Sequence, residues 1–158
     1  MIDKNKILNE LIKIAQKNLD DAKTAFDTTK SHTSNPEMKA EGKYDTRSIE
    51  AGYLAGAQKV RVDELEGELK LLEEINLEHS NKIVSVGSLV EIELNNLKKL
   101  YFIASTSGGT ILNIENHPIL VISAFSPIGD GVIGLNVGDV FELENKNGVR
   151  EYTICNLW

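Results

Sequence analysis

Histidine and cysteine are the residues of this sequence that could carry chemistry on their own. The three histidines, His32, His79 and His117, stand far apart and lack the spacing of metal ligands, so we interpret them as surface residues. The single cysteine, Cys155, excludes a disulfide framework and a cysteine-based zinc cluster. Its place in an alternating segment predicts a small packed side chain. We therefore expect no catalytic constellation and predict that the protein is not an enzyme in its own right.

A glycine pattern in the second half of the chain superficially matches a phosphate-binding loop. Gly129, Gly131 and Gly134 give G-x-G-x-x-G. A dinucleotide site also needs a strand before this pattern and a strand–helix–strand unit around it. The segment lacks that context, so the match does not predict a nucleotide site.

Charge and hydropathy limit the class of protein. The 158 residues hold 17 basic and 24 acidic side chains, a formal net charge of −7, which argues against direct DNA binding. If the protein acts near nucleic acid, another macromolecule must bring it there. Residues 1–16 lack the apolar core of a signal peptide, and no stretch approaches the length of about 20 apolar residues that a membrane span needs. We expect a cytoplasmic protein without a membrane partner.

Two long helices are predicted in the first half of the chain. Between residues 3 and 30, apolar side chains recur three or four positions apart, and a second such stripe runs between residues 47 and 77. The matching lengths predict an antiparallel coiled-coil hairpin over residues 1–79. Ser, Thr, Asn and Pro residues between positions 31 and 47 predict the turn at its tip.

The period changes near residue 80, and residues 80–158 hold eight of the 12 glycines. Alternating apolar residues predict a strand at 84–94 interrupted at Gly87, with further strands at 100–104, 119–122, 139–143 and 151–154. Residues 145–148, Asn-Lys-Asn-Gly, predict a hairpin turn. Residues 131–135 predict a short helix. The fold class expected is therefore α+β: a helical hairpin followed by a small, mainly antiparallel sheet.

The segment Ser-Pro-Ile-Gly-Asp-Gly-Val-Ile-Gly-Leu-Asn-Val-Gly-Asp, residues 126–139, is the most distinctive one. It resembles the S-P-I-G element in the C-terminal domain of the GreA/GreB transcript-cleavage family. Residues 84–88 resemble the opening strand of that domain, and residues 147–154 resemble its closing hairpin. The resemblance covers about residues 80–158 and implies an FKBP-like fold there. A preceding coiled-coil hairpin is also the layout of that family.

The resemblance implies a transcription elongation regulator that binds RNA polymerase through its secondary channel. In such proteins the FKBP-like domain docks beside the channel, and Phe125, Ser126 and Pro127 match the loop expected to touch the polymerase. The basic residues usual in the neighbouring positions are replaced by Asp130 and Leu135. In such proteins the hairpin enters the channel, where acidic tip residues help to hold a second Mg²⁺ at the active site of the polymerase. The resemblance therefore implies that the protein contacts nascent RNA only indirectly. No stably bound cofactor is implied.

The tip of this chain differs from the tip in that family, where two acidic residues stand three positions apart. Asp45 and Glu50 are the best candidates to assist the polymerase Mg²⁺, with Glu41 third. Five residues along a helix turn by about 140°, so Asp45 and Glu50 converge on one metal only if Asp45 lies in the loop. Lys43 and Arg47 further neutralise the tip. The same residues also fit a solvated turn and helix cap.

Several functions remain open at this stage. A Gre-like factor either stimulates cleavage of backtracked RNA or occupies the channel without stimulating cleavage. A coiled-coil adaptor that pairs with a second copy through its hairpin is a further alternative. An FKBP-type prolyl isomerase is an alternative from another class, and it requires a pocket lined by aromatic residues. The candidates for that lining are Tyr101, Phe102, Phe125, Phe141, Tyr152 and Trp158.

Overall fold

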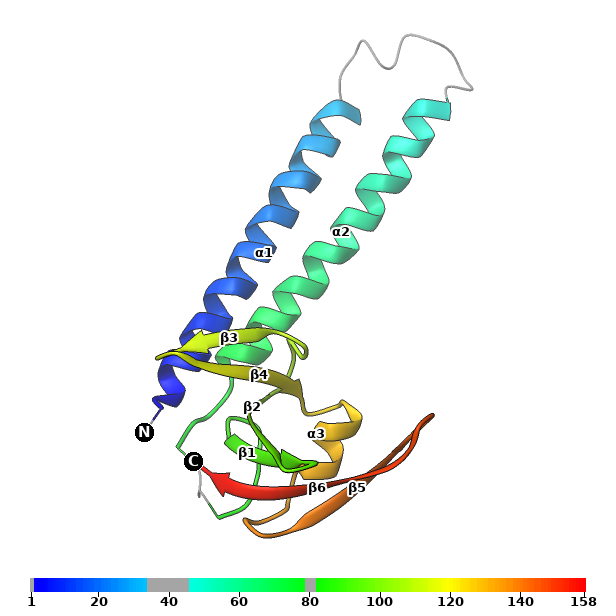
Figure 1. The fold of residues 1–158 in the computed structure, drawn as a ribbon. Helices are drawn as coiled ribbons and strands as arrows, with labels where there is room; N and C mark the ends of the chain where they lie inside the picture. The colour runs from blue at the N-terminus through cyan, green and yellow to red at the C-terminus, as the bar shows by residue number, and fades with distance from the viewer. Residues whose placement is uncertain (1, 34–45, 79–81) are drawn as a thin grey trace. The chain divides into compact units, whose positions relative to one another are not determined.

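A computed structural model describes residues 2–33, 46–78 and 82–158 of the chain. Two long helices come first, α1 (Lys4–Thr33) and α2 (Thr46–Glu73). Six strands and one short helix follow: β1 (Leu89–Leu94), β2 (Leu97–Ala104), β3 (Ile111–Ile114), β4 (His117–Ser123), α3 (Pro127–Val132), β5 (Val140–Asn145) and β6 (Gly148–Leu157). Figure 1 shows this order. The α+β class predicted from the sequence, with a helical pair before a mainly antiparallel sheet, is confirmed.

The chain divides into two compact units that do not coincide with the halves of the sequence. Unit 1 comprises Met1–Ile12 and Leu71–Trp158, and unit 2 comprises Lys13–Lys70. The ends of both long helices that are remote from the tip therefore group with the sheet. The predicted division of the chain into 1–79 and 80–158 stays a prediction.

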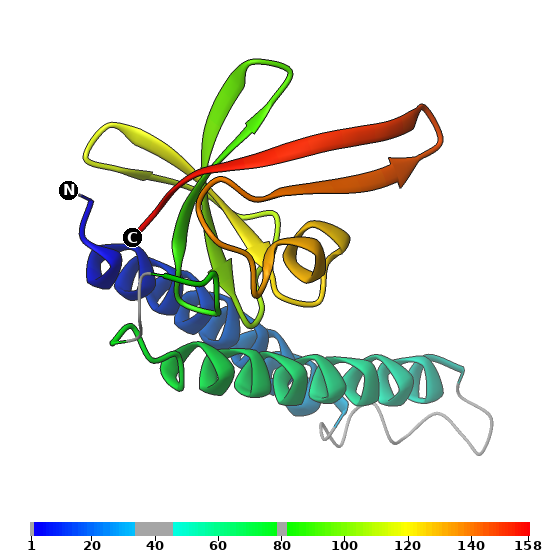
Figure 2. The same ribbon diagram turned by 90° about the horizontal axis from the view of Figure 1, so that it is seen from below.

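Unit 2 is a pair of antiparallel helices held together by one apolar stripe on each. Leu19 of α1 and Val62, Leu65 and Leu69 of α2 are buried, at the three- and four-residue spacing that the sequence predicts. At the edge of the interface, Lys23 Nζ of α1 lies 2.8 Å from Glu66 Oε1 of α2. The two helices lie side by side in both views (Figures 1 and 2).

The apolar stripe becomes thinner toward the tip. Phe26 of α1 and Ala51, Ala55 and Gln58 of α2 are only half-buried, although they continue the heptad spacing. Small or polar side chains remove less apolar surface from water than leucine does, so these layers contribute less to stability. Gln58 also has a buried side-chain oxygen without a hydrogen-bond partner. The pair is therefore held mainly by its layers around Leu19 and Leu65.

The sheet of unit 1 has the strand order β3-β4-β2-β1-β6-β5. Strands β2 and β4 run parallel, with Leu100 opposite Ile119, and all other neighbouring pairs are antiparallel. The predicted turn at 145–148 is confirmed, because Asn145 pairs with Gly148 and Gly148 has a φ of 109°. Strand β3 was not predicted, because it is only four residues long and mostly exposed.

Two local predictions are wrong. Residues 84–88 do not form a strand: residues 86 and 87 form a turn, in which Gly87 has a φ of 90° and its N–H donates to the carbonyl oxygen of Ile103 at 2.7 Å. The short helix runs over Pro127–Val132, not over 131–135. Ser126 caps its N-terminus and proline is its first residue, both of which favour a helix start at that point.

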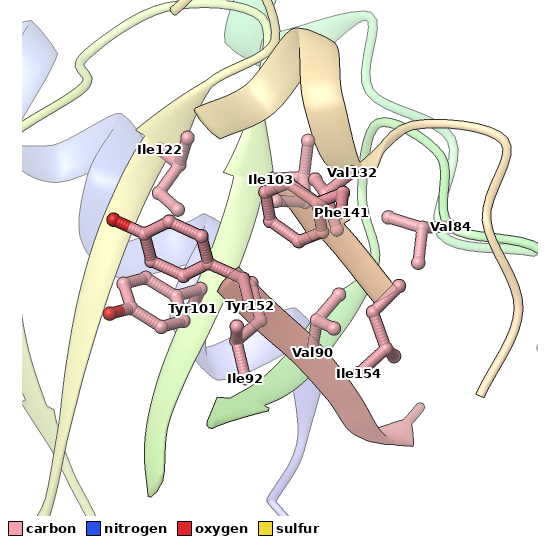
Figure 3. Close-up of a cluster of buried hydrophobic side chains, with 10 residues drawn as sticks. All are labelled: Val84, Val90, Ile92, Tyr101, Ile103, Ile122, Val132, Phe141, Tyr152 and Ile154. Atoms are coloured by element: carbon pink, nitrogen blue, oxygen red, sulfur yellow. The ribbon is translucent and has the colours of Figure 1, made fainter. Parts of the chain in front are cut away.

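The core of the sheet lies between the strands and α3. Figure 3 shows how buried side chains of β1, β2, β4, β5 and β6 meet Val132 of α3. Phe141 and Tyr152 stack across β5 and β6 with ring centroids 5.1 Å apart. The members of the cluster are Val84, Val90, Ile92, Tyr101, Ile103, Ile122, Val132, Phe141, Tyr152 and Ile154. The cluster fixes the position of α3, and thereby of the segment that leads into it.

Alternate residues of the same strands point to the opposite face of the sheet and are buried as well. Phe102 and Ile119 are fully buried there, and so are Ile7 and Leu72 from the helical segments of unit 1. The first turn of α1 is also tied to the β3–β4 turn, because Lys6 Nζ lies 2.5 Å from Glu115 Oε1. Over the described residues, no helix is long and apolar enough to cross a membrane.

Candidate functional site

The segment that joins β4 to α3 carries the three residues predicted to dock on a partner. Ser126 has its side chain folded back onto the chain: its hydroxyl accepts the N–H of Gly129 at 3.1 Å and donates to the carbonyl oxygen of Ser123 at 2.7 Å. The N–H of Ser126 donates to the same Ser123 oxygen at 2.9 Å. Pro127 begins α3 with its φ already restricted to helical values. Ser126 and Pro127 therefore hold the turn in shape.

Gly129 permits the close backbone approach on which this tight turn depends. A Cβ atom at this position would lie 2.1 Å from the carbonyl oxygen of Ser123, so no other residue fits without a shift of the backbone. At the preceding end, the N–H of Ala124 donates to the carbonyl oxygen of Ala104 at 2.8 Å. The turn is thus fixed at both ends by the backbone of the sheet.

Phe125 lies at the apex of this turn and is 86% exposed. Its N–H donates to the Ser123 hydroxyl at 3.3 Å, which orients the backbone at the point where the ring leaves it. The tightly constrained turn holds this aromatic ring in water, where exposure of its apolar surface is unfavourable in free energy. Burial of the ring against a partner would remove that surface from water and be favourable. Of the three docking candidates, Phe125 and Pro127 are exposed and available to a partner, whereas Ser126 is half-buried and positions them.

A groove of about 750 Å³ runs beside this turn. It is lined by Phe125, Ser126 and Pro127, by the loop of residues 105–109 between β2 and β3, and by residues 120–123 of β4. Leu71 of α2, which is 44% exposed, also lines the groove. The structure therefore brings the three predicted docking residues together at one groove.

Sequence reasoning missed the 105–109 loop and Leu71. The loop follows a strand with the run Ser-Thr-Ser-Gly-Gly, which reads as an ordinary turn. A Cβ atom on Gly108 would lie 2.9 Å from the backbone nitrogen of Ser123, so a glycine there permits the close approach to β4. The glycine pair at positions 108 and 109 is the signal in the sequence that could have indicated a closely packed loop. The pair does not reveal that the loop packs against β4.

The candidate metal-assisting residues are only partly within the described structure. Glu50 lies near the start of α2 and is exposed, whereas Asp45 and Glu41 lie outside the described residues. Two of the residues within one turn of Glu50 are exposed apolar side chains, Ile49 and, at 78% exposed, Tyr53, and three others, Thr46, Arg47 and Ser48, are polar or charged. In the parts of the chain that the structure describes, no group of three or more His, Cys, Asp or Glu side chains could hold a metal ion. Glu50 by itself supplies one carboxylate, which is too few ligands for Mg²⁺.

The remaining candidates for chemistry are the histidines and the single cysteine. His32 and His117 are exposed, and His79 lies outside the described residues. Cys155 is half-buried, and burial is the main factor that raises the pKa of its thiol, which favours the protonated form.

The aromatic residues of unit 1 mostly fill its interior. Tyr101, Phe102, Phe141 and Tyr152 are buried by the sheet, where they pack rather than line a pocket. Phe125 borders the docking groove and Trp158 lines a separate hollow with Ile2. This arrangement gives no support to an aromatic-lined isomerase pocket.

Comparison with known proteins identifies a family whose model matches this chain. The family model described as "Transcription elongation factor, GreA/GreB, C-term" matches residues 79–158, which include the whole sheet and the docking groove except Leu71. The chain belongs to the GreA/GreB transcription elongation factor family. The family resemblance inferred from residues 126–139 is thereby confirmed.

Individual relatives extend the match beyond the C-terminal domain. The transcription inhibitor protein Gfh1 of Thermus thermophilus is 30% identical over 123 residues, which cover 74% of each chain. The transcription elongation factor GreA of Clostridium kluyveri is 27% identical over 124 residues, 77% of this chain and 72% of that one. The crystal structure of Gfh1 from Thermus aquaticus covers 97% of this chain and 92% of its own at 21% identity, with a TM-score of 0.41.

Proposed function

We propose that this protein is a transcription elongation regulator that binds RNA polymerase. In this proposal the groove beside Phe125 docks on the polymerase, and the α1–α2 pair enters the secondary channel. In this proposal the protein acts on the active site of the polymerase and does not catalyse a reaction by itself. The observation that carries the proposal is the family match over residues 79–158, whose one strongly exposed aromatic side chain, among the residues described, is Phe125.

The acidic residues at the tip are proposed to act at the active site of the polymerase. Glu50, together with Asp45 and Glu41, would lend carboxylate oxygens to a Mg²⁺ ion that the polymerase itself holds in part. Glu50, near the start of α2, is exposed and supplies one carboxylate. A single carboxylate there fits a metal site whose other ligands come from the polymerase. The metal is shared with the polymerase in this proposal, and the protein contacts nascent RNA only through that site.

A second candidate function is occupation of the channel without stimulation of cleavage. It is favoured by the exposed apolar residues Ile49 and Tyr53 that flank Glu50, where a metal site would call for further oxygen ligands. A relative that is 30% identical to this chain carries the name of a transcription inhibitor. Both candidate functions use the same docking groove and differ only at the tip.

A backtracked elongation complex distinguishes the two candidates. The complex is mixed with the wild-type protein or with Glu50→Gln and Asp45→Asn variants, and cleavage of the 3′ end of the RNA is followed over time. A cleavage stimulator accelerates this reaction, and loss of one metal-binding carboxylate reduces the acceleration about tenfold or more. If the wild type slows or does not change cleavage while it binds the polymerase, the second function is correct.

A further inference from the structure

Helix α2 carries a second apolar stripe, on the face opposite the one that packs on α1. Ile49, Tyr53 and Val60 are all more than half exposed. Together with Gly56 they follow the alternating spacing of four and three residues that is typical of a coiled-coil seam. Val62, two residues after Val60, is buried, and two residues along a helix turn by about 200°. The exposed residues therefore form a separate outer stripe, which the described part of the chain leaves uncovered.

Gly56 leaves a gap in the outer stripe. A Cβ atom added to it would meet no other atom within 4 Å, so packing within the described chain does not require a glycine there. Glycine in the interior of a helix costs about 1 kcal/mol of stability relative to alanine. A gap between the exposed side chains of Tyr53 and Val60 is the kind of hole that receives a large side chain when two helices pack closely. The outer stripe thus offers both a large ring and a place for one.

The outer stripe is complementary to itself. Its spacing is the same in both directions, and its six members over residues 46–63 are Thr46, Ile49, Tyr53, Gly56, Val60 and Asp63. On an antiparallel second copy of α2, position 53 lies opposite position 56, and position 49 lies opposite position 60. The Tyr53 ring would then cover Gly56 of the second copy, and Ile49 would pack on Val60 of the second copy. At each end, the Thr46 hydroxyl would face the Asp63 carboxylate.

We propose that the outer stripe is a self-association surface, which binds the antiparallel α2 of a second copy of this chain. The contact is isologous, because each copy contributes one ring and one gap. The charges beside the stripe are compatible with it. Lys59 lies opposite Gly52 of the second copy, and Glu50 lies opposite Ala57 of the second copy, so no like charges meet over residues 46–63. Asp63 already pairs with Lys59 on its own helix, so its charge is not left unpaired at the end of the contact.

Like charges oppose the other ways of pairing two α2 helices through this stripe. In a parallel pair, the two copies of Asp63 face each other. A shift of the antiparallel pair by one heptad places Lys59 opposite Lys59 and Glu50 opposite Glu64. A shift in the other direction places Glu50 opposite Glu50. Because contacts between like charges are unfavourable, they select the register in which Tyr53 lies opposite Gly56.

The size of the stripe sets the strength of the pairing. Each copy contributes three large apolar side chains, Ile49, Tyr53 and Val60, which is fewer than in a stable dimer interface. A dissociation constant of about 0.1 mM is therefore expected. The pairing requires no RNA polymerase, so it goes beyond the proposed function and stands or falls separately from it.

Sedimentation equilibrium of the full-length chain, from about 10 µM to about 1 mM, tests the pairing. The wild type is expected to change from monomer to dimer over this range. Ile49→Glu and Val60→Lys each place a charge against an apolar side chain of the second copy, and each should weaken dimerisation about tenfold or more. Leu54→Glu is the matched control, because Leu54 is exposed on α2 but lies outside the stripe. Circular dichroism confirms that each variant keeps its helix content.

An equimolar mixture of Ile49→Glu and Val60→Lys tests the register. In an antiparallel pair of the two variants, the new glutamate meets the new lysine in one layer, and Val60 meets Ile49 in the other. The mixture should therefore dimerise within about threefold of the wild type. A wild type that stays monomeric up to about 1 mM would overturn the inference. So would a dimer that neither variant weakens, or a mixture that dimerises no better than its components.

Discussion

The docking groove and the helical pair are constrained to very different degrees. At the groove, a Cβ atom added to Gly129 would lie 2.1 Å from the carbonyl oxygen of Ser123, and hydrogen bonds fix both ends of the turn. In the helical pair, a Cβ atom added to Gly52, Gly56 or Gly67 would meet no atom within 4 Å, and the apolar stripe thins toward the tip. Preorganisation of the groove lowers the cost of binding a partner. The turn beside the groove therefore tolerates less change than the described part of the helical pair does.

Glycine substitutions should reveal this contrast most strongly. Gly129→Ala forces the Ser123–Ser126 turn apart and is expected to destabilise the protein by about 3 kcal/mol or more. Gly67→Ala adds a methyl group in open space on α2 and removes a helix-disfavouring residue, so it should be neutral or stabilise by up to about 1 kcal/mol. Chemical denaturation of both variants measures the difference. Equal effects of the two substitutions would contradict the contrast between the regions.

Truncation of apolar side chains should reveal the thinning of the helical interface. Leu65 is 3% exposed, and Leu65→Ala is expected to cost about 2–3 kcal/mol, at the lower end for a buried leucine because two helices can partly close the gap. Phe26, nearer the tip, is only half-buried, so Phe26→Ala should cost about 1 kcal/mol. Thermal unfolding of the two variants provides the measurement. A larger loss for Phe26→Ala would show that the tip layers hold the pair together.

Sequence patterns predicted the long-range features well because those features depend on periodicity. The stripes containing Leu19 and Leu65 gave both helices, and the Asn-Gly pair at 147–148 gave the hairpin turn. The segment at 84–88 was misread because alternation alone cannot reveal that Gly87 adopts a positive φ against the backbone of Asn76. Helix α3 was placed too late because the apolar residues after Gly131 outweighed the capping signal of Ser126 and Pro127.

The candidate site was only partly predictable for a physical reason. Phe125, Ser126 and Pro127 are contiguous in sequence, so their resemblance to a known element identified them. Residues 105–109 also line the groove, and they reach it because β2 and β4 pair in parallel. No pattern within one short segment encodes that pairing.

Removal of the Ser126 hydroxyl should have a moderate effect at the docking turn. Ser126→Ala loses the hydrogen bond that caps α3 and leaves the turn less well fixed, for an expected cost of about 1 kcal/mol in stability. Ser126→Thr retains a hydroxyl and should recover most of that stability, which makes it the matched control. If the two variants unfold at the same denaturant concentration, the cap is not what stabilises the turn.

The smallest expected effect concerns the ion pair between α1 and the β3–β4 turn. The hydrogen bond and charge of Lys6 hold the pKa of Glu115 below its ordinary value, so the pair stabilises the folded state at neutral pH and that contribution is lost as the pH falls through the lowered pKa. Glu115→Gln should therefore be slightly less stable than the wild type near pH 7, and the difference should vanish well below about pH 4. Urea denaturation across this range measures it. A difference that grows in acid would contradict the assignment.

Direct binding to RNA polymerase tests the central claim most directly. Wild-type protein and Phe125→Ala are titrated into core polymerase, with Leu97→Ala as a control at an exposed apolar side chain outside the groove. The wild type and Leu97→Ala are expected to bind with dissociation constants of about 1 µM or tighter, and Phe125→Ala about tenfold more weakly. Absence of wild-type binding at about 10 µM, or unchanged binding of Phe125→Ala, would contradict the proposal that this groove docks on the polymerase.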